Sequence, residues 1–177
     1  MKKLIGTVLA ASLMFSSAGV AQAAVSPTTV KTLGAQGKLP KTPGKIGMTY
    51  NTLKKSVKGG KLYDSEMGVY YATRNSTAIY LFPKFSKSSV YGSTKVYAID
   101  RTFKQSSFTK KLTASVMQQT FKNHTYIGGQ FYDSYIYRNA YKSGKYYVMH
   151  KARANNTVTL SVGKKNDLSY TGLWVND

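Results

Sequence analysis

Runs of tyrosine and apolar residues, separated by short groups of glycine, proline, asparagine and serine, recur along most of the chain. The clearest example is residues 131–153, FYDSYIYRNAYKSGKYYVMHKAR, in which two tyrosine-rich runs flank Lys142-Ser143-Gly144-Lys145. This tetrapeptide has the composition of a short hairpin turn, because Gly144 can take a positive φ. Tyrosine suits a half-exposed sheet, since its ring packs on the pleated surface while its hydroxyl stays at the wet edge. The pattern predicts an antiparallel hairpin whose outer side is aromatic and cationic.

Other short runs have the same β-type composition. In the first half they are residues 61–63, 68–73, 77–82 and 95–100, and in the second half residues 125–127, 131–139, 145–151 and 157–162. Turn residues separate them. Residues 168–175, which hold the only tryptophan, are predicted to add a last strand or to pack across the core.

The first stretch with helical spacing follows Thr49. Tyr50, Leu53 and Val57 recur on one face of a helix, and Thr49 is a good N-cap for it. Lysines gather toward its C-terminal end, and the glycines that begin at Gly59 end it. The pattern predicts a short amphipathic helix before the first group of strands.

A second short helix follows the same plan. Thr113 is its N-cap and comes 113 − 49 = 64 residues after Thr49. At the same offset Met117 matches Leu53, and Phe121 matches the next apolar position. Because 60 residues bury only a marginal core, two such units are expected to share one sheet. The sequence therefore predicts an α+β fold, an antiparallel sheet with two short helices on one face, built from tandem units of about residues 48–105 and 112–166.

The N-terminal residues read as a targeting segment. Two lysines, a short apolar run and the small residues Ala21-Gln22-Ala23 predict a secretory signal peptide at 1–23. Residues 24–47, rich in proline and glycine with at most a marginal helix, are expected to form an extended leader into a domain at 48–177. No stretch of the mature chain approaches the roughly 20 apolar residues that span a bilayer. The sequence thus predicts a secreted, extracellular protein.

The charge of the chain indicates anionic partners. There are 26 basic and 6 acidic residues, and removing Lys2 and Lys3 leaves 24 − 6 = +18 for the mature chain. Aromatic residues are plentiful, so this is a folded basic protein rather than a disordered tail. By electrostatics alone, its partner is a wall polymer, a lipid surface, nucleic acid or an acidic protein.

Cysteine is absent from the chain. This excludes a disulfide framework, thiolate catalysis and a cysteine-containing zinc site. A secreted chain without disulfides that carries a lysine-rich signal fits export from a bacterium.

Several segments together resemble a known group of proteins. In order they are GKLPKTPGKIGMTYNTLKKSVKGG, YYAT, KVYAIDRTFK, KLTASVMQQTF, YIYR and SGKYYVMH. Over residues 32–166 the chain resembles a family of secreted Gram-positive proteins of unknown function, similar in architecture to β-lactamase-inhibitor-type proteins. The resemblance implies tandem helix-plus-sheet units and a non-enzymatic binding or inhibitory role, with no catalytic residues to carry over.

Catalytic chemistry finds little support in the residues. Asp64 and Glu66 would share a face of a strand but lie in a turn-like segment, so a glycosidase pair is not favoured. His124 and His150 are the only histidines, too few and too far apart for a local metal motif. Neither a catalytic nor a metal-binding residue is predicted, and no cofactor is expected. A small secreted ribonuclease, with His150 in the hairpin, remains the enzymatic alternative.

The leading hypothesis is a secreted, cationic, non-enzymatic binding or inhibitor-like protein. Its target would be a protein or an anionic cell-wall polymer, the second making it an envelope-associated basic protein. Nucleic acid is a possible target that no recognised motif supports. The expected binding residues lie on the tyrosine-rich hairpin: Tyr146, Tyr147, Lys142, Lys145, Lys151 and Arg153.

Overall fold

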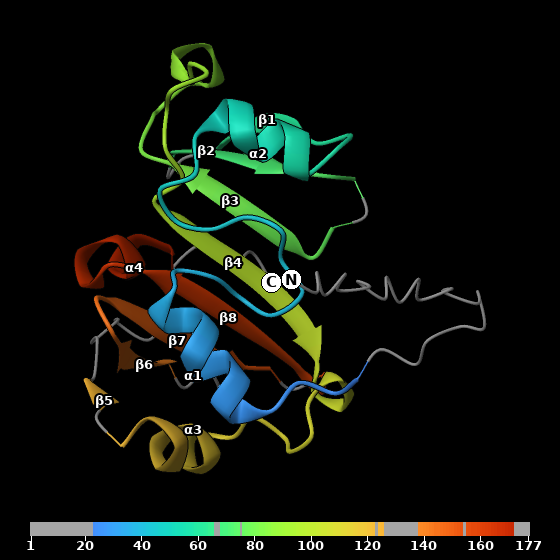
Figure 1. Ribbon diagram of the computed structural model, residues 1–177, viewed down its shortest axis with the longest axis vertical. Coiled ribbons are helices and arrows are strands. Elements are labelled where there is room, and N and C mark those ends of the chain that lie inside the picture. Colours follow the sequence, from blue (N-terminus) through green and yellow to red (C-terminus); the bar gives the residue numbers. More distant parts are fainter. Residues whose placement is uncertain are drawn as a thin grey trace, which may run out of the picture.

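A single antiparallel sheet organises the protein. The structure is a computed structural model that describes residues 23–65, 68–74, 76–122, 124–125, 138–153 and 155–171. Within them, eight strands form one sheet in the order β1-β2-β3-β4-β8-β7-β6-β5 (Figure 1). The strands are β1 (Lys61–Ser65), β2 (Gly68–Ala72), β3 (Ala78–Phe82), β4 (Ala98–Lys104), β5 (His124–Thr125), β6 (Arg138–Ser143), β7 (Tyr146–Ala152) and β8 (Thr157–Gly163).

Short helices accompany the sheet. They are α1 (Pro27–Ala35), α2 (Tyr50–Ser56), α3 (Ala114–Phe121) and α4 (Lys165–Thr171), with the 3-10 turns η1 (Lys87–Ser89) and η2 (Gln105–Ser107). None of the helices in the described part of the chain has the length and apolar character needed to cross a bilayer. The α+β class and the antiparallel sheet predicted from the sequence are confirmed.

Over the described residues, a helix and four strands follow one another in each half of the chain. A helix precedes four strands twice, α2 before β1–β4 and α3 before β5–β8. The last strands of the two groups, β4 and β8, pair in the middle of the sheet from Ile99↔Val162 to Lys104↔Thr157. Two four-stranded units thus share one sheet across this β4–β8 seam. This arrangement is what a tandem duplication would produce, and the duplication itself stays a prediction.

The two faces of the sheet have different covers. On β7, Tyr146, Val148 and His150 alternate with Tyr147 and Met149, because successive side chains of a strand point to opposite faces. Tyr146 and Val148 of the first set belong to the main core together with residues of α1, α2 and α3, and we call this side the α1 face. Met149 and Tyr147 pack with Leu168 of α4 on the other side, the α4 face. Figure 1 shows α1 over the part of the sheet that holds β6 and β7, which it contacts, and α2 over the first strands.

The two predicted helices begin at their predicted caps. The Thr49 hydroxyl accepts from the N–H of Thr52 at 3.3 Å, and the Thr113 hydroxyl accepts from the N–H of Val116 at 3.2 Å. Leu53 of α2 and Met117 of α3 are completely buried in the core on the α1 face. Capping and helical spacing therefore located both elements correctly.

The expected extended leader at 24–47 is instead part of the folded core. Ser26 caps α1, and Val30 and Leu39 are at most 1% exposed. A Cβ at Gly34 would lie 2.3 Å from Val148 Cγ2, so this glycine lets α1 approach the sheet closely. The prediction of a leader was wrong because proline and glycine here shape a turn-rich segment that is held by tertiary packing.

Of the two alternatives predicted for residues 168–175, the last strand is wrong over the described residues. A last strand was expected at 168–175, but residues 165–171 form α4. Leu168 is completely buried and packs with Ala140 and Met149 on the α4 face. Residues 172–175 lie outside the described part of the chain, as do residues 131–137 of the tyrosine-rich stretch.

Candidate functional site

The predicted tyrosine-rich hairpin is formed by β6 and β7. Their register runs from Arg138↔Lys151 to Ser143↔Tyr146, and Gly144 in the turn has a φ of 61°. The turn position and its glycine are therefore confirmed. The Ser143 hydroxyl donates to the carbonyl oxygen of Lys31 in α1 at 2.6 Å, which ties the end of the hairpin to that helix.

The tyrosines of the predicted binding set do not share one exposed face. Tyr146 is 8% exposed and belongs to the core under α1, with the Lys145 Nζ 5.3 Å from its ring centroid. Tyr147 lies on the α4 face and is half-buried. The expectation that Tyr146 lies on an exposed outer side of the hairpin is therefore wrong. Strand alternation puts neighbouring tyrosines on opposite faces of the sheet, and helices cover both faces here.

The cations of the set divide in the same way. Lys142 and Lys145 are exposed at the turn, whereas Lys151 is only 5% exposed and Arg153 is half-buried. The expectation that Lys151 is exposed is wrong, because this residue lies in the middle of the sheet, where it pairs with Thr159 of β8. Of the six residues, Lys142 and Lys145 alone are exposed, and the binding role of the set stays a prediction.

A buried polar row crosses the seam on the α4 face. Asp100 and Ser161 face each other across β4 and β8, and the hydroxyl oxygens of Thr102 and Thr159 lie 2.9 Å apart. Burial raises the pKa of Asp100 to about 7, although the Ser161 hydroxyl and the nearby charge of Lys151 act to lower it. Because of this burial, the Asp100 carboxyl keeps its proton up to a pH near neutrality.

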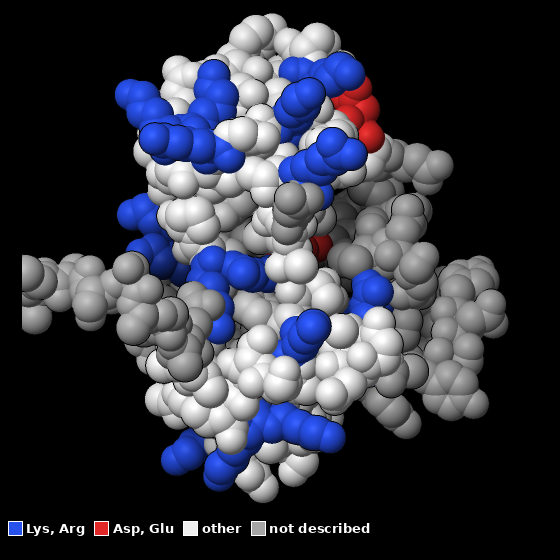
Figure 2. Space-filling view, turned by 90° about the vertical axis from the view of Figure 1, so that its right-hand side faces the viewer, with Lys and Arg blue, Asp and Glu red and all other residues white. Residues whose placement is uncertain are grey.

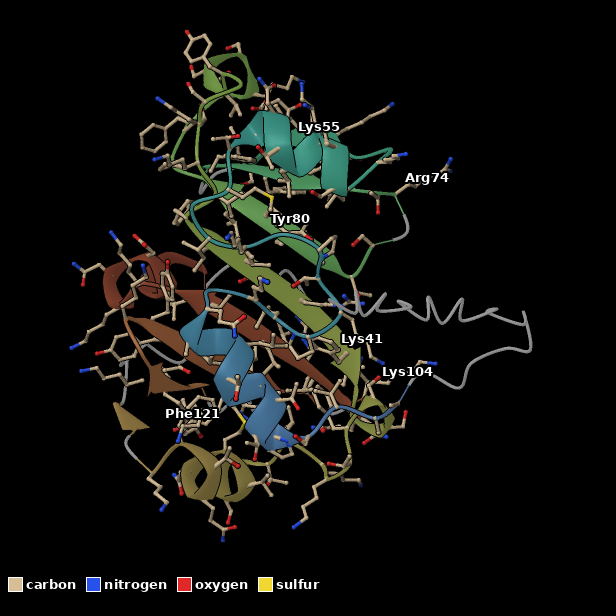
Figure 3. The ribbon with its side chains drawn as sticks, viewed as in Figure 1. Lys41, Lys55, Arg74, Tyr80, Lys104 and Phe121 are labelled. Atoms are coloured by element: carbon tan, nitrogen blue, oxygen red, sulfur yellow. The ribbon has the colours of Figure 1, made fainter. Side chains whose placement is uncertain are left out.

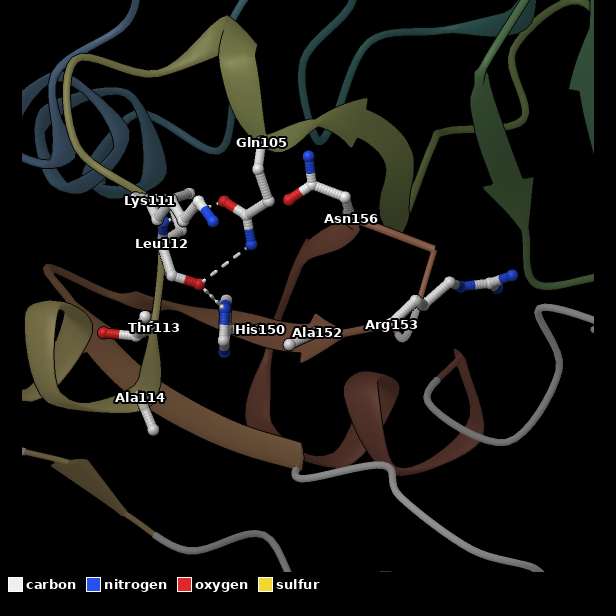
Figure 4. A pocket seen from close by; sticks show the side chains of 9 residues that line it. All are labelled: Gln105, Lys111, Leu112, Thr113, Ala114, His150, Ala152, Arg153 and Asn156. Atoms are coloured by element: carbon white, nitrogen blue, oxygen red, sulfur yellow. Dashed lines mark hydrogen bonds between the residues drawn. The ribbon is translucent and has the colours of Figure 1, made fainter.

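A pocket of about 290 Å³ lies beside β7 on the α1 face (Figure 4). Its floor is His150, 1% exposed, whose Nε2 donates to the carbonyl oxygen of Leu112 at 2.6 Å. Gln105 binds the backbone of the same residue, since its Oε1 accepts from the N–H of Leu112 at 2.8 Å and its Nε2 donates to the Leu112 carbonyl oxygen at 3.3 Å. The other lining residues are Lys111, Thr113, Ala114, Ala152, Arg153 and Asn156.

The setting of the histidine in this pocket disfavours its charged form. Burial lowers the pKa of His150, and the hydrogen bond to Leu112 opposes that shift only in part. The Nδ1 atom of His150 has no hydrogen-bond partner among the described residues. A single fixed imidazole of lowered pKa is a structural donor to a backbone carbonyl. Sequence reasoning missed the pocket because Gln105 and Leu112 are remote from the hairpin in the chain.

The described part of the chain contains no group of three or more histidine, aspartate or glutamate residues that could hold a metal ion. The Asp64 carboxylate accepts from the Lys87 N–H at 2.5 Å and forms an ion pair with the Lys87 Nζ at 3.7 Å. Glu66, its proposed partner in a catalytic pair, lies outside the described residues. The Asp64 carboxylate thus anchors a neighbouring loop.

Exposed cations are spread over the surface. Figure 2 shows Lys and Arg side chains from one end of a face to the other, with acidic side chains at an upper edge and in one small central spot. Lys41, Lys55, Arg74 and Lys104 are labelled along the molecule in Figure 3. The exposed cations of the described residues are Lys45, Lys54, Lys55, Lys58, Lys61, Arg74, Lys87, Lys95, Lys104, Lys110, Lys111, Lys122, Lys142, Lys145, Lys164 and Lys165. Of the described acids, Asp64 alone is exposed and Asp167 is half-buried.

One connection displays aromatic rings to solvent, and sequence reasoning did not single it out. It is the stretch at residues 83–95 between β3 and β4, here called the aromatic loop, which includes η1 at the upper tip of the molecule in Figure 1. Phe85 is 91% exposed and Tyr91 is 67% exposed. Isolated aromatic residues in a loop look the same in a sequence whether they pack inward or outward, so only the fold reveals them.

Over the residues that the structure describes, the fold and surface define a cationic α+β protein whose sheet is built from two four-stranded groups. A scan against protein-family models finds no match, and a search of curated proteins finds none. Among solved structures, this chain is similar to the DUF4309 family protein YjgB from Bacillus subtilis, with a TM-score of 0.50 and 12% sequence identity. The similarity covers 78% of this chain and 95% of YjgB. At this identity it shows a shared fold, found in a protein of a Gram-positive bacterium.

Proposed function

We propose that this chain is a secreted, non-enzymatic cationic protein that binds an anionic polymer of the cell envelope, of the kind whose backbone carries phosphate groups. The excess of cations carries the proposal. Even if each of the 6 acidic residues neutralised one cation, 24 − 6 = 18 positive charges of the chain without its signal segment would remain for a partner.

The distribution of these charges favours an extended partner over a small ligand. Lys54, Lys55 and Lys58 lie on or next to the single short helix α2, while Lys142 and Lys145 occupy the hairpin turn in the other half of the sheet. A phosphate-bearing chain running over the surface could contact both regions, with each contact releasing a counterion.

The same geometry gives less support to the alternatives. A ribonuclease would need two groups that exchange protons at one phosphate, whereas the His150 ring is buried and bonded to the Leu112 carbonyl. An inhibitor-like role requires a complementary protein surface rather than dispersed lysines, because lysine is depleted from protein–protein interfaces. Both remain hypotheses that the same experiment addresses.

The test is the salt dependence of binding to a soluble polyphosphate, with dextran as the neutral control. Because binding by counterion release weakens steeply with salt, the affinity is expected to fall about 1,000-fold between about 50 mM and about 200 mM salt. Replacing Lys54, Lys55 and Lys58 together by serine should lower both the affinity and the slope of its logarithm against that of salt concentration. Three exposed serines or threonines, Thr28, Ser93 and Ser115, replaced by alanine provide the uncharged control.

The outcomes separate the candidate functions. Polyphosphate affinity that does not change with salt would contradict the proposal. A single protein retained from culture medium at high salt would indicate an inhibitor-like role instead. Degradation of RNA that disappears in His150→Ala would indicate the ribonuclease.

A further inference from the structure

The aromatic loop is an exposed apolar feature that charge-driven polymer binding does not use. Phe85 and Tyr91 are 91% and 67% exposed, while Val90 between them is 8% exposed and belongs to the core. Single exposed apolar residues are ordinary, but this loop at the tip of the molecule carries two largely exposed aromatic rings only six residues apart in the chain.

The backbone of this loop is held in place by its neighbours. The carbonyls of Gly92 and Thr94 accept from the N–H groups of Asn51 and Tyr50 at 3.0 Å and 2.8 Å, which joins the loop to the start of α2. On the other side, the Lys87 N–H donates to the Asp64 carboxylate of β1 at 2.5 Å. The rings are therefore presented by a fixed platform, so little order has to be gained when they are buried.

The surroundings of the tip are cationic. Residues 49–95, which contain α2, the first three strands and the loop, include 8 lysines and arginines and 2 acidic residues, for a net charge of 8 − 2 = +6. Lys84 lies directly beside Phe85 in the chain, and Lys95 is exposed at the end of the loop. The carboxylate of Asp64 is already paired with Lys87.

Protruding rings surrounded by lysines match the interface of an anionic bilayer. Aromatic rings are favoured at the headgroup level, and lysines near them are attracted to the negative charge of an anionic leaflet. A specific protein partner would instead need roughly 800 Å² of complementary surface on this side, far more than two rings on a convex tip provide. A hydrophilic polymer would leave the rings in water.

We propose that the aromatic loop docks the protein onto anionic lipid, with Phe85 and Tyr91 inserted at the headgroup level and the lysines around them contacting lipid phosphates. This docking depends on the rings and is separate from the polymer binding proposed above.

The test is co-sedimentation with vesicles of phosphatidylglycerol mixed with phosphatidylcholine. Residues 24–177 are the protein to use, because they contain every described helix and strand and lack the apolar N-terminal run, which would itself bind lipid. Binding to these vesicles and not to pure phosphatidylcholine is expected. Replacing Phe85 and Tyr91 together by serine should weaken the partition about tenfold or more, since burial of apolar surface drives the insertion. The thermal midpoint should not change, because both rings are exposed.

A fluorescent reporter tests insertion directly. In a Trp174→Phe background, which removes the only tryptophan, Phe85→Trp should shift its emission to the blue when anionic vesicles are added. Gln119→Trp, on the exposed side of α3 in the other half of the molecule, is the matched control and should not shift. Unchanged partition of the serine variant, or an unshifted emission of the Phe85→Trp variant, would overturn the proposal. Polyphosphate affinity of the serine variant should equal that of wild type, so failure of lipid docking and failure of polymer binding are read separately.

Discussion

At the scale of single residues, Asp100 has a setting that its residue type does not suggest. It is 3% exposed at the seam of the sheet, where an aspartate in a strand would ordinarily face water. Burial raises its pKa from 3.8 to about 7. Between these values the folded protein holds a proton that the unfolded chain has lost, so this residue makes stability fall as the pH rises from about 4 to about 7.

We predict that Asp100→Asn removes this pH dependence. Asparagine resembles the protonated carboxyl, so the variant should gain stability over wild type as the pH rises from 5 to 8, by roughly 2 to 4 kcal/mol. Urea unfolding of both proteins at the two pH values measures the difference. His150 is present in both proteins, and its own titration cancels. An equal wild-type-to-variant difference at pH 5 and pH 8 would show that Asp100 does not titrate in this range.

At the scale of elements, residues 24–47 behave as part of the domain. Besides α1, the loop that follows reaches across the sheet, where the Arg101 side chain of β4 donates to the carbonyl oxygens of Lys41 and Pro40. Leu39 is 1% exposed in the same loop. Contacts from a segment without regular structure thus complete the α1 face of the sheet.

We predict that Leu39→Ala lowers the free energy of unfolding by about 2 to 5 kcal/mol, because it leaves a cavity in a core that cannot collapse fully. Lys45→Ala in the same loop is the matched control. Its side chain is exposed, and a change within about 0.5 kcal/mol is expected. Urea unfolding followed by circular dichroism measures both. Equal stability of Leu39→Ala and wild type would mean that the segment is only a leader.

At the scale of the whole molecule, the two four-stranded groups depend on each other through the β4–β8 seam. Ile99 and Val162 are both completely buried where they pair, and six residue pairs join the strands. If the halves separated, these apolar side chains and two rows of backbone hydrogen-bonding groups would be exposed. The protein should therefore behave as one cooperative unit.

We predict a single unfolding transition, with far-UV and tyrosine near-UV circular dichroism changing together. Residues 48–110 alone, which contain α2 and the strands β1–β4, should show no cooperative transition, since so short a unit with an uncovered edge has too little core. The full chain from residue 24 is the positive control. Two separable transitions, or a folded fragment, would contradict a shared core.

The sequence by itself determined the local elements. Threonine caps and helical spacing located α2 and α3, and the tyrosine-rich runs around Gly144 located the hairpin. These features depend on interactions within a few residues, such as a hydroxyl bonded to an N–H in the next turn or a glycine with positive φ. The net charge, which also needs no structure, predicts an anionic partner, and this stays a prediction.

Only the tertiary structure decided which side chains are exposed and so available for binding. Tyr146 and Phe85 are both aromatic residues close to a lysine, yet one is buried under α1 and the other is 91% exposed. Whether a ring is covered depends on segments distant in the chain, here α1 and α4, which lie on opposite faces of one sheet. Strand alternation determines only which side chains share a face, whereas tertiary packing determines which face is covered. The exposed aromatic loop could therefore be found only from the folded structure.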